Sequence, residues 1–333
     1  MLGGSAAHHP PVRPPHRAQV APILLTLLVV SCTGATDHAT TASPASSVAA
    51  TSAPSAAPTP SVAEDELPGT APPSLPDASP PAALPVRPAI SSSRPPPGFA
   101  LHVPILMYHR IVPTNEAGNA LPGLVVSPQL FAAQMKALHD AGWHAVTMKE
   151  LFEALQAGHQ LAARTFAITI DDGWDDGYRY ALPILQANGF HATYFVVAGR
   201  IGNDPGVLTR DQVRALAAAG NEIDDHTYDH VEVTHLDAAH LHYEVMAAAA
   251  RIAALAGSWP IAFAYPFGRY DALALDELAA DGFGLAVTTR EGALETWQGR
   301  LALPRVRVGP GTSPVGLMAE VNRLEQGGGS ISG

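Results

Sequence analysis

Short apolar runs alternate with amphipathic or alanine-rich stretches over residues 103–308 of the sequence. The apolar runs have the length and composition of buried strands, and the stretches between them have the residue spacing of helices. Strands are expected at residues 103–108, 143–147, 165–170, 191–197, 222–225, 261–265, 284–288 and 306–308. This alternation predicts an α/β fold built around a mostly parallel sheet.

Capping signals support the helices expected between these strands. Ser127 followed by Pro128 is typical of an N-cap and a first helical residue, and Thr147 with Glu150 has the spacing of a capping box. Seven or eight strand–helix units in about 235 residues favour a closed or nearly closed barrel. A doubly wound open sheet is the alternative, although no glycine-rich fingerprint or phosphate-binding loop supports nucleotide binding.

The first 98 residues differ sharply in composition from the rest of the chain. They contain no Phe, Trp or Tyr, and they hold 20 of the 31 prolines. Such a segment cannot bury enough apolar surface to offset the entropy lost on ordering. We therefore expect residues 32–98 to form a disordered linker rich in Ala, Ser, Thr and Pro, which precedes one folded domain over residues 99–333.

The N-terminal residues 1–31 have the pattern of a secretory signal. Arg13 and Arg17 precede an apolar run over residues 20–30, which is too short for a typical spanning helix. The sequence Val29-Val30-Ser31-Cys32 resembles the bacterial lipobox, which implies cleavage before Cys32 and lipid attachment to it. This predicts an extracytoplasmic protein anchored to a bacterial membrane through Cys32; an ordinary cleaved signal is the alternative.

Charge and cysteine content restrict the function of the folded domain. Residues 99–333 carry 15 Lys and Arg against 25 Asp and Glu, so we expect no nucleic-acid partner, because such binding needs a basic surface. The single cysteine excludes a disulfide framework and a cysteine-ligated zinc site.

Polar clusters follow three of the expected strands directly. They are Asp171-Asp172, residues 225–230 and residues 265–268, and the carboxyl ends of barrel strands converge on one face. His226 and His230 are four residues apart, so on a helical turn both imidazoles would face one ion. Two histidines and one carboxylate are typical ligands of catalytic zinc, and a second, free carboxylate would suit a general base.

These segments carry a family resemblance that covers roughly residues 103–308. The stretches VPILMYHRI, FAITIDDGWDDG, NEIDDHTYDHVEVTHL and FAYPFG resemble the polysaccharide deacetylases of carbohydrate esterase family 4, which have the NodB-homology fold. The resemblance implies a deformed (β/α) barrel and metal-dependent N-deacetylation of an acetamido-sugar polymer. The form of the first and last of these stretches is closest to exported enzymes that act on poly-β-1,6-N-acetylglucosamine.

The resemblance also implies roles for individual residues. Asp171 would be the general base, and the backbone N–H of Phe267 would stabilise the oxyanion. Thr227 would form a hydrogen bond within the metal-binding loop. The metal ligands would be Asp172, His226 and His230, most often with zinc, although cobalt and nickel also occur in the family.

Two expected residues of the family are absent from their usual positions. Ala264 stands where an arginine usually orients the base, and Arg305 and Arg307 are the replacements considered. No histidine follows Leu303 to act as proton donor, and the family's Asp-x-x-Asp-Trp pattern is not evident. His109 is the candidate donor, because it ends a strand on the predicted site face and its ordinary pKa suits proton transfer near neutral pH.

The sequence therefore predicts a metal-dependent hydrolase that removes N-acetyl groups from a polysaccharide containing N-acetylglucosamine. Two alternatives remain: a catalytically impaired carbohydrate-binding protein on the same fold, and a related hydrolase of small amides. Five other histidines are expected on the solvated surface: His139, His144, His159, His240 and His242.

Overall fold

The computed structural model describes residues 84–87 and 89–327. The predicted signal peptide, Cys32 and the linker up to residue 83 lie outside the described residues. Within the described part of the chain, no helix is both long and apolar enough to cross a membrane.

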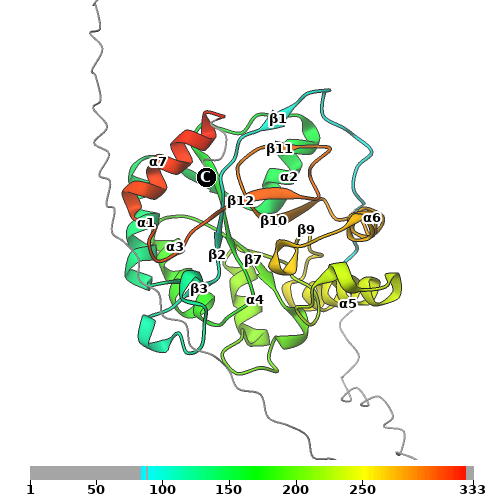
Figure 1. Cartoon of the computed structure of the whole chain (residues 1–333), viewed down its shortest axis with the longest axis horizontal. Coiled ribbons are helices and arrows are strands. Elements are labelled where there is room, and N and C mark those ends of the chain that lie inside the picture. Colours follow the sequence, from blue (N-terminus) through cyan, green and yellow to red (C-terminus); the bar gives the residue numbers. More distant parts are fainter. Residues whose placement is uncertain (1–83, 88, 328–333) are drawn as a thin grey trace, which may run out of the picture. The chain divides into compact units, whose positions relative to one another are not determined.

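Seven parallel strands form a closed barrel at the centre of the domain (Figure 1). In order around the ring they are β2 (Ile105–Tyr108), β12 (Leu303–Arg307), β10 (Leu285–Glu291), β9 (Ala262–Ala264), β8 (Glu222–Asp225), β7 (Thr193–Val196) and β6 (Thr165–Ile170). The pairing of β6 with β2 closes the ring. This confirms the predicted barrel and excludes the doubly wound open sheet.

The barrel is deformed at β6, as the family resemblance implies. Ala167 pairs with β2 on one edge of β6 and with β5 (His144–Val146) on the other. Two residues further along, Thr169 pairs with β2 and with β7. The strands β5 and β7 therefore share one edge of β6, and β5 stands outside the closed ring.

Helices cover the outside of the barrel (Figure 1). They are α1 (Pro128–Asp140), α2 (Met148–Ala157), α3 (Leu182–Ala187), α4 (Arg210–Ala218), α5 (Ala238–Ala256), α6 (Ala272–Ala280) and α7 (Pro314–Glu325). The predicted caps are confirmed: the Ser127 side chain accepts from the N–H of Leu130, and Thr147 and Glu150 form a capping box. The helix α7 was not predicted, although Ser313 and Pro314 carry the same start signal as α1.

One predicted helix is interrupted. The stretch from Gly177 to Asn188 begins with a π-helical turn over Gly177–Ala181, and α3 follows it. Pro183 has no N–H, so it cannot donate to the preceding turn and the regular α-helical ladder is broken there.

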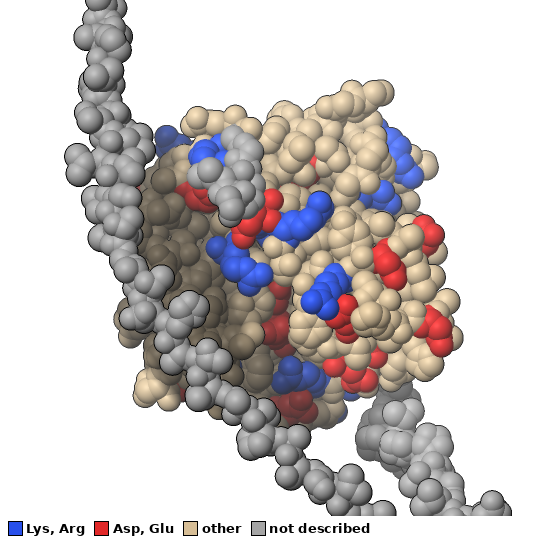
Figure 2. All heavy atoms as spheres, viewed as in Figure 1, with Lys and Arg blue, Asp and Glu red and all other residues tan. Residues whose placement is uncertain are grey.

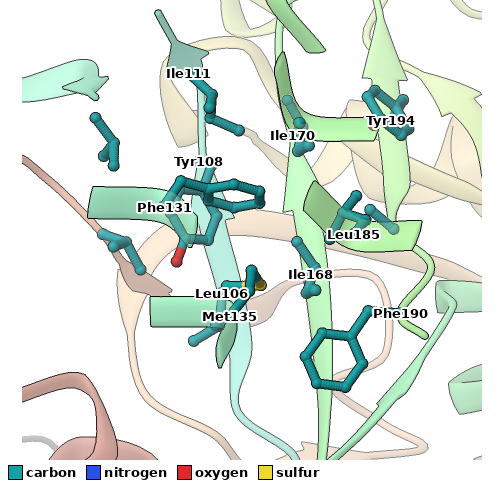
Figure 3. Close-up of a cluster of buried hydrophobic side chains, with 14 of the residues drawn as sticks. Leu106, Tyr108, Ile111, Phe131, Met135, Ile168, Ile170, Leu185, Phe190 and Tyr194 are labelled. Atoms are coloured by element: carbon teal, nitrogen blue, oxygen red, sulfur yellow. The ribbon is translucent and has the colours of Figure 1, made fainter. Parts of the chain in front are cut away.

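Alternate strand residues pack into two different layers. Ile105, Ala167 and Phe195 belong to one buried cluster, whereas Leu106 and Ile168 belong to a second cluster together with side chains from α1. Figure 3 shows the second cluster, in which the Tyr108 ring lies against Phe131 of α1 with the ring centroids 5.0 Å apart. Both faces of these strands are buried, so their side chains are mainly apolar, with buried polar exceptions such as Asp224 and Arg305.

Residues 84–87 and 89–98, which the sequence analysis assigns to the linker, make defined contacts with the domain. Trp259 Nε1 donates to the carbonyl of Pro85 at 2.6 Å, and Gln156 Nε2 donates to the carbonyl of Ser91 at 3.1 Å. The Arg94 guanidinium lies over the ring of Trp297. Hydrogen-bonding and aromatic side chains of the domain thus hold this segment, and Ile90 packs against the buried cluster that contains Ile105.

Charged side chains are interspersed on the face shown in Figure 2. Lysine and arginine residues there lie beside acidic ones and form no continuous basic surface on this face.

Candidate active site

The loops at the carboxyl ends of three strands bring the site residues together. Asp171 and Asp172 follow β6, His226 follows β8, and His109 follows β2. All strands of the barrel are parallel, so these ends lie at the same mouth of the barrel.

Asp172, His226 and His230 form a compact group of ligand atoms. Asp172 Oδ1 lies 3.4 Å from Nε2 of each histidine, and the three ligand atoms lie within 4.8 Å of one another. Ligand atoms about 2.0–2.1 Å from a zinc ion are spaced in this way. These three side chains can hold one divalent ion.

The two histidines meet through a loop and not through a helical turn, so that part of the prediction is wrong. Residues 226–230 contain no helix, and Thr227 and His230 have left-handed φ angles of 66° and 62°. The Thr227 hydroxyl accepts from the N–H of His230 at 2.9 Å, which stabilises the tight turn. Asp172 and Phe267 also have positive φ, so backbone strain is concentrated at this mouth of the barrel.

The orientation of His226 leaves one nitrogen available to an ion. Its Nδ1 donates to the carbonyl of Ala264 at 2.7 Å, so the lone pair of Nε2 faces Asp172. Burial lowers the pKa of His226, but the adjacent carboxylates of Asp172 and Asp171 outweigh burial and the net shift is upward.

Two buried carboxylates anchor the loop that carries the histidines. Asp225 Oδ1 accepts from the N–H of Thr227 at 2.8 Å. Glu244 of α5 accepts from the N–H groups of Tyr228 and Asp229 at 3.0 and 2.9 Å through a single oxygen. These bonds compensate the unpaired N–H groups of an irregular loop.

Asp171 forms a buried, bidentate ion pair with Arg305 of β12. The two N–O distances are 2.8 and 2.7 Å, and both side chains are at most 2% exposed. Burial raises the pKa of Asp171, but the guanidinium outweighs burial and the pKa lies below its ordinary value. Arg305 thus contacts the carboxylate that Ala264 cannot reach, whereas Arg307 is exposed.

His109 lies beside the same carboxylate. Its Nε2 is 3.8 Å from Asp171 Oδ2, and its side chain is 13% exposed. Burial lowers the pKa of His109, and the neighbouring Asp171 opposes this shift without reversing it. A neutral imidazole next to an ionised carboxylate can accept and return a proton.

Aromatic residues border the ligand group. Trp174 Nε1 donates to Asp172 Oδ2 at 3.2 Å, and the Phe267 side chain is 58% exposed with its ring 5.1 Å from that of His230. Burial raises the pKa of Asp172, but His226 and His230 outweigh burial and bring the pKa well below its ordinary value. Phe267 offers an exposed apolar face of the kind that suits sugar rings, whereas the guanidinium groups of Arg110 and Arg200 lie over the ring of Trp174.

Glu244 was missed in the sequence analysis, although the sequence contains a signal for it. It lies three residues after Leu241 and four before Ala248, which are both buried. A glutamate on the apolar stripe of a helix must be paired, since burying an unpaired charge is costly. Such a residue marks a functional or structural contact.

Several known proteins are similar to this chain in sequence. The model of the polysaccharide deacetylase family matches residues 158–286. YxkH of Bacillus subtilis (strain 168) is 36% identical over 223 residues, which cover 67% of this chain and 77% of YxkH. A chitin deacetylase from Pestalotiopsis sp is 31% identical over 122 residues, which cover 36% of this chain and 39% of that enzyme.

Solved structures show the same fold. The deacetylase PplD of Streptococcus pyogenes, in complex with acetate, has a TM-score of 0.61 and 30% identity, covering 66% of this chain and 97% of PplD. IcaB from Ammonifex degensii has a TM-score of 0.58 at 24% identity, covering 67% of this chain and 97% of IcaB. The family resemblance is thereby confirmed, and the chain belongs to the polysaccharide deacetylase family of hydrolases.

Proposed function

We propose that this protein removes N-acetyl groups from a polysaccharide that contains N-acetylglucosamine, in a metal-dependent reaction. The observation that carries the proposal is the ionised Asp171, held by Arg305, beside the ligand group of Asp172, His226 and His230. A general base next to a cation site is an arrangement that accelerates the hydrolysis of an amide by water.

The ligand group fits a divalent metal ion. One carboxylate and two imidazoles suit zinc best, with cobalt or nickel as alternatives, and the Ala264 carbonyl fixes the tautomer of His226 that such an ion needs. When bound, the ion supplies Lewis-acid stabilisation of the negative charge that develops on the amide oxygen.

Asp171 is the proposed general base. Its carboxylate takes a proton from the water whose oxygen attacks the acetamide carbonyl carbon. Arg305 keeps this carboxylate ionised before attack and fixes its direction through two parallel hydrogen bonds. The C–N bond then breaks, the departing amine receives a proton, and acetate is released.

His109 is the proposed proton donor to the departing amine, and the Phe267 N–H the proposed donor to the oxyanion. His109 Nε2 lies 3.8 Å from Asp171 Oδ2, so the proton that the base has accepted would pass to His109 once the two side chains approach to hydrogen-bond distance. Phe267 has a left-handed backbone and its ring lies 5.1 Å from that of His230, which supports an oxyanion donor at this residue.

The substrate class is supported by the relatives and by the rim of the site. The Pestalotiopsis relative is a chitin deacetylase, and chitin is a polymer of N-acetylglucosamine. PplD holds acetate, which is the product expected of deacetylation. The exposed Phe267 ring would stack on a pyranose ring.

Arg305 weakens the case for a binding protein without turnover. That alternative was based on the missing arginine and histidine, and a buried arginine does contact Asp171. The deciding experiment measures acetate released from N-acetylglucosamine oligomers, with and without a chelator. Binding without acetate release would favour the binding protein, and release only from small amides would favour the small-amide hydrolase.

The proposed location is the outer side of a bacterial membrane, with lipid on Cys32. The basis is the signal-like N-terminus. Cys32→Ser should move the protein out of the membrane fraction or leave a precursor of altered mobility. Unchanged partition and mobility would favour an ordinary cleaved signal.

A further inference from the structure

A second cluster of nitrogen and oxygen ligand atoms lies outside the barrel, between α5 and α6 (Figure 1). His242 comes from α5, Glu277 comes from the last turn of α6, and Asp281 is the C-cap residue that follows α6. The three ligand atoms lie within 4.8 Å of one another. His242 Nδ1 is 2.6 Å from Glu277 Oε1 and 3.4 Å from Asp281 Oδ2.

The packing of α5 against α6 fixes the backbone positions of these three residues. Glu277 and Asp281 are four residues apart, so their side chains share one face of α6. Leu241 and Val245 of α5 pack in the same hydrophobic core as Leu278 of α6. The two helices are therefore packed together directly beside the three ligand residues. The positions of the ligand atoms therefore depend on packed helices and not on a loose loop.

The local electrostatics call for a cation at this position. The C-terminal end of a helix carries a partial negative charge, which disfavours carboxylates there, and the last turn of α6 contains no basic residue. Asp281 Oδ2 is shielded from solvent and accepts no hydrogen bond from the described residues. Burial and the adjacent Glu277 both raise the pKa of Asp281, and His242 and Arg87 oppose this shift without reversing it.

We propose that His242, Glu277 and Asp281 bind a divalent transition-metal ion that joins α5 to α6. One imidazole and two carboxylates suit zinc, cobalt or manganese better than calcium, which prefers oxygen ligands alone. The 3.4 Å between His242 Nδ1 and Asp281 Oδ2 matches the edge of a tetrahedral zinc site with bonds of about 2.0–2.1 Å. The 2.6 Å between His242 Nδ1 and Glu277 Oε1 is a hydrogen bond, which metal binding would replace by two metal–ligand bonds. Water would fill the remaining coordination positions.

This ion would act on the structure and not on the reaction. His242 lies two residues before Glu244, which accepts hydrogen bonds from the loop that carries His226 and His230. An ion that fixes this part of α5 would therefore also restrain the loop. The proposal does not depend on the proposed catalytic function, because its ligands form a separate group.

The test is equilibrium dialysis of the full chain against Zn²⁺, with the bound metal measured by elemental analysis. We expect His242→Ala to bind one ion fewer per chain than wild type. His240→Ala, at an exposed histidine on the same turn of α5, is the matched control and should bind as many ions as wild type. Excess Ca²⁺ should not displace the ion.

Further variants separate this site from the catalytic one. Glu277→Gln, which preserves shape, should also lose one ion, and the losses in His230→Ala and His242→Ala should add in the double variant. If His242→Ala and Glu277→Gln bind the same number of Zn²⁺ ions as wild type with the same affinity, the cluster is only an ion pair and the proposal is wrong.

Discussion

Buried carboxylates in two regions of this molecule have opposite pKa shifts. Asp171 and Asp172 lie at the catalytic mouth, and their pKa values are lowered. Asp224 in β8 and Glu295 in β11 (Glu295–Thr296) are also buried, but their pKa values are raised, that of Glu295 to about 8. Burial acts in the same direction in both regions, so the difference comes from the neighbours.

The neighbours of the first pair are cations or groups that can become cations, namely Arg305 and two histidines. The second pair accepts hydrogen bonds from backbone N–H groups: Asp224 from Ile261 and Ala262, and Glu295 from Val103. Asp224 and Glu295 thus link neighbouring chain segments, whereas Asp171 is kept ionised for chemistry. Burial alone does not make a carboxylate reactive; the paired cation does.

The largest effect is expected for Asp171→Asn, which tests whether the cation-paired carboxylate is the reactive one. The amide cannot accept a proton, so turnover should fall by the ~10²–10⁴ typical of general acid–base groups, while the ligands of the metal site remain. Acetate release and bound metal should be measured on the same preparation. Asp224→Asn, in the second region, is the control and should retain turnover. Activity of Asp171→Asn near that of wild type would transfer the role of base to another group.

Removing the Arg305 guanidinium should produce the second-largest effect, a loss of folding stability. Arg305→Met would leave the Asp171 carboxylate buried without a partner, which typically lowers the free energy of unfolding by about 3–5 kcal/mol. Urea unfolding checks this loss, and Arg307→Met, at an exposed arginine on the same strand, should unfold like wild type. Because an unpaired carboxylate can escape the penalty by protonation, Arg305→Met combined with Asp171→Asn should be more stable than Arg305→Met alone. Equal stability of wild type and Arg305→Met would contradict the comparison.

The raised pKa of Glu295 predicts a dependence of stability on pH. Its pKa in the folded protein, about 8, lies above its ordinary value of 4.5, so the contribution of Glu295 is complete below about pH 4.5 and is lost as the pH rises through 8. Glu295→Gln should therefore unfold like wild type at low pH and be more stable above pH 8, on the order of a few kcal/mol.

Chemical unfolding across this pH range measures the effect of Glu295→Gln. Glu153→Gln, at an exposed residue of α2, is the control and should follow wild type at every pH. If the difference between Glu295→Gln and wild type does not change with pH, the carboxyl group does not hold a proton in the folded protein.

The parts of the fold that depend on local patterns were predictable from the sequence. Apolar runs such as Thr165–Ile170 and the capping box of Thr147 give the strands and helices directly, because their signals are confined to a few neighbouring residues. The stretches FAITIDDGWDDG and NEIDDHTYDHVEVTHL contain Asp171 and the three ligand residues, so these could also be predicted. Arg305 and Glu244 lie far from these residues in sequence, and only the closure of β12 on β2 and the packing of α5 bring them to the site.

The smallest effect is expected for Glu244→Gln. This variant tests whether a carboxylate that is bonded to backbone N–H groups also stabilises the metal-binding loop. One oxygen of Glu244 accepts from the N–H groups of both Tyr228 and Asp229. Loss of its charge weakens both bonds and should loosen the loop that holds His226 and His230. Residues that orient metal ligands typically contribute 10–100-fold to metal affinity, so the dissociation constant, measured by competition with a chelator, should rise by about this factor. His240→Gln on the exposed side of α5 is the control. An unchanged dissociation constant would mean that the loop holds its shape without Glu244, through Asp225 and Thr227 alone.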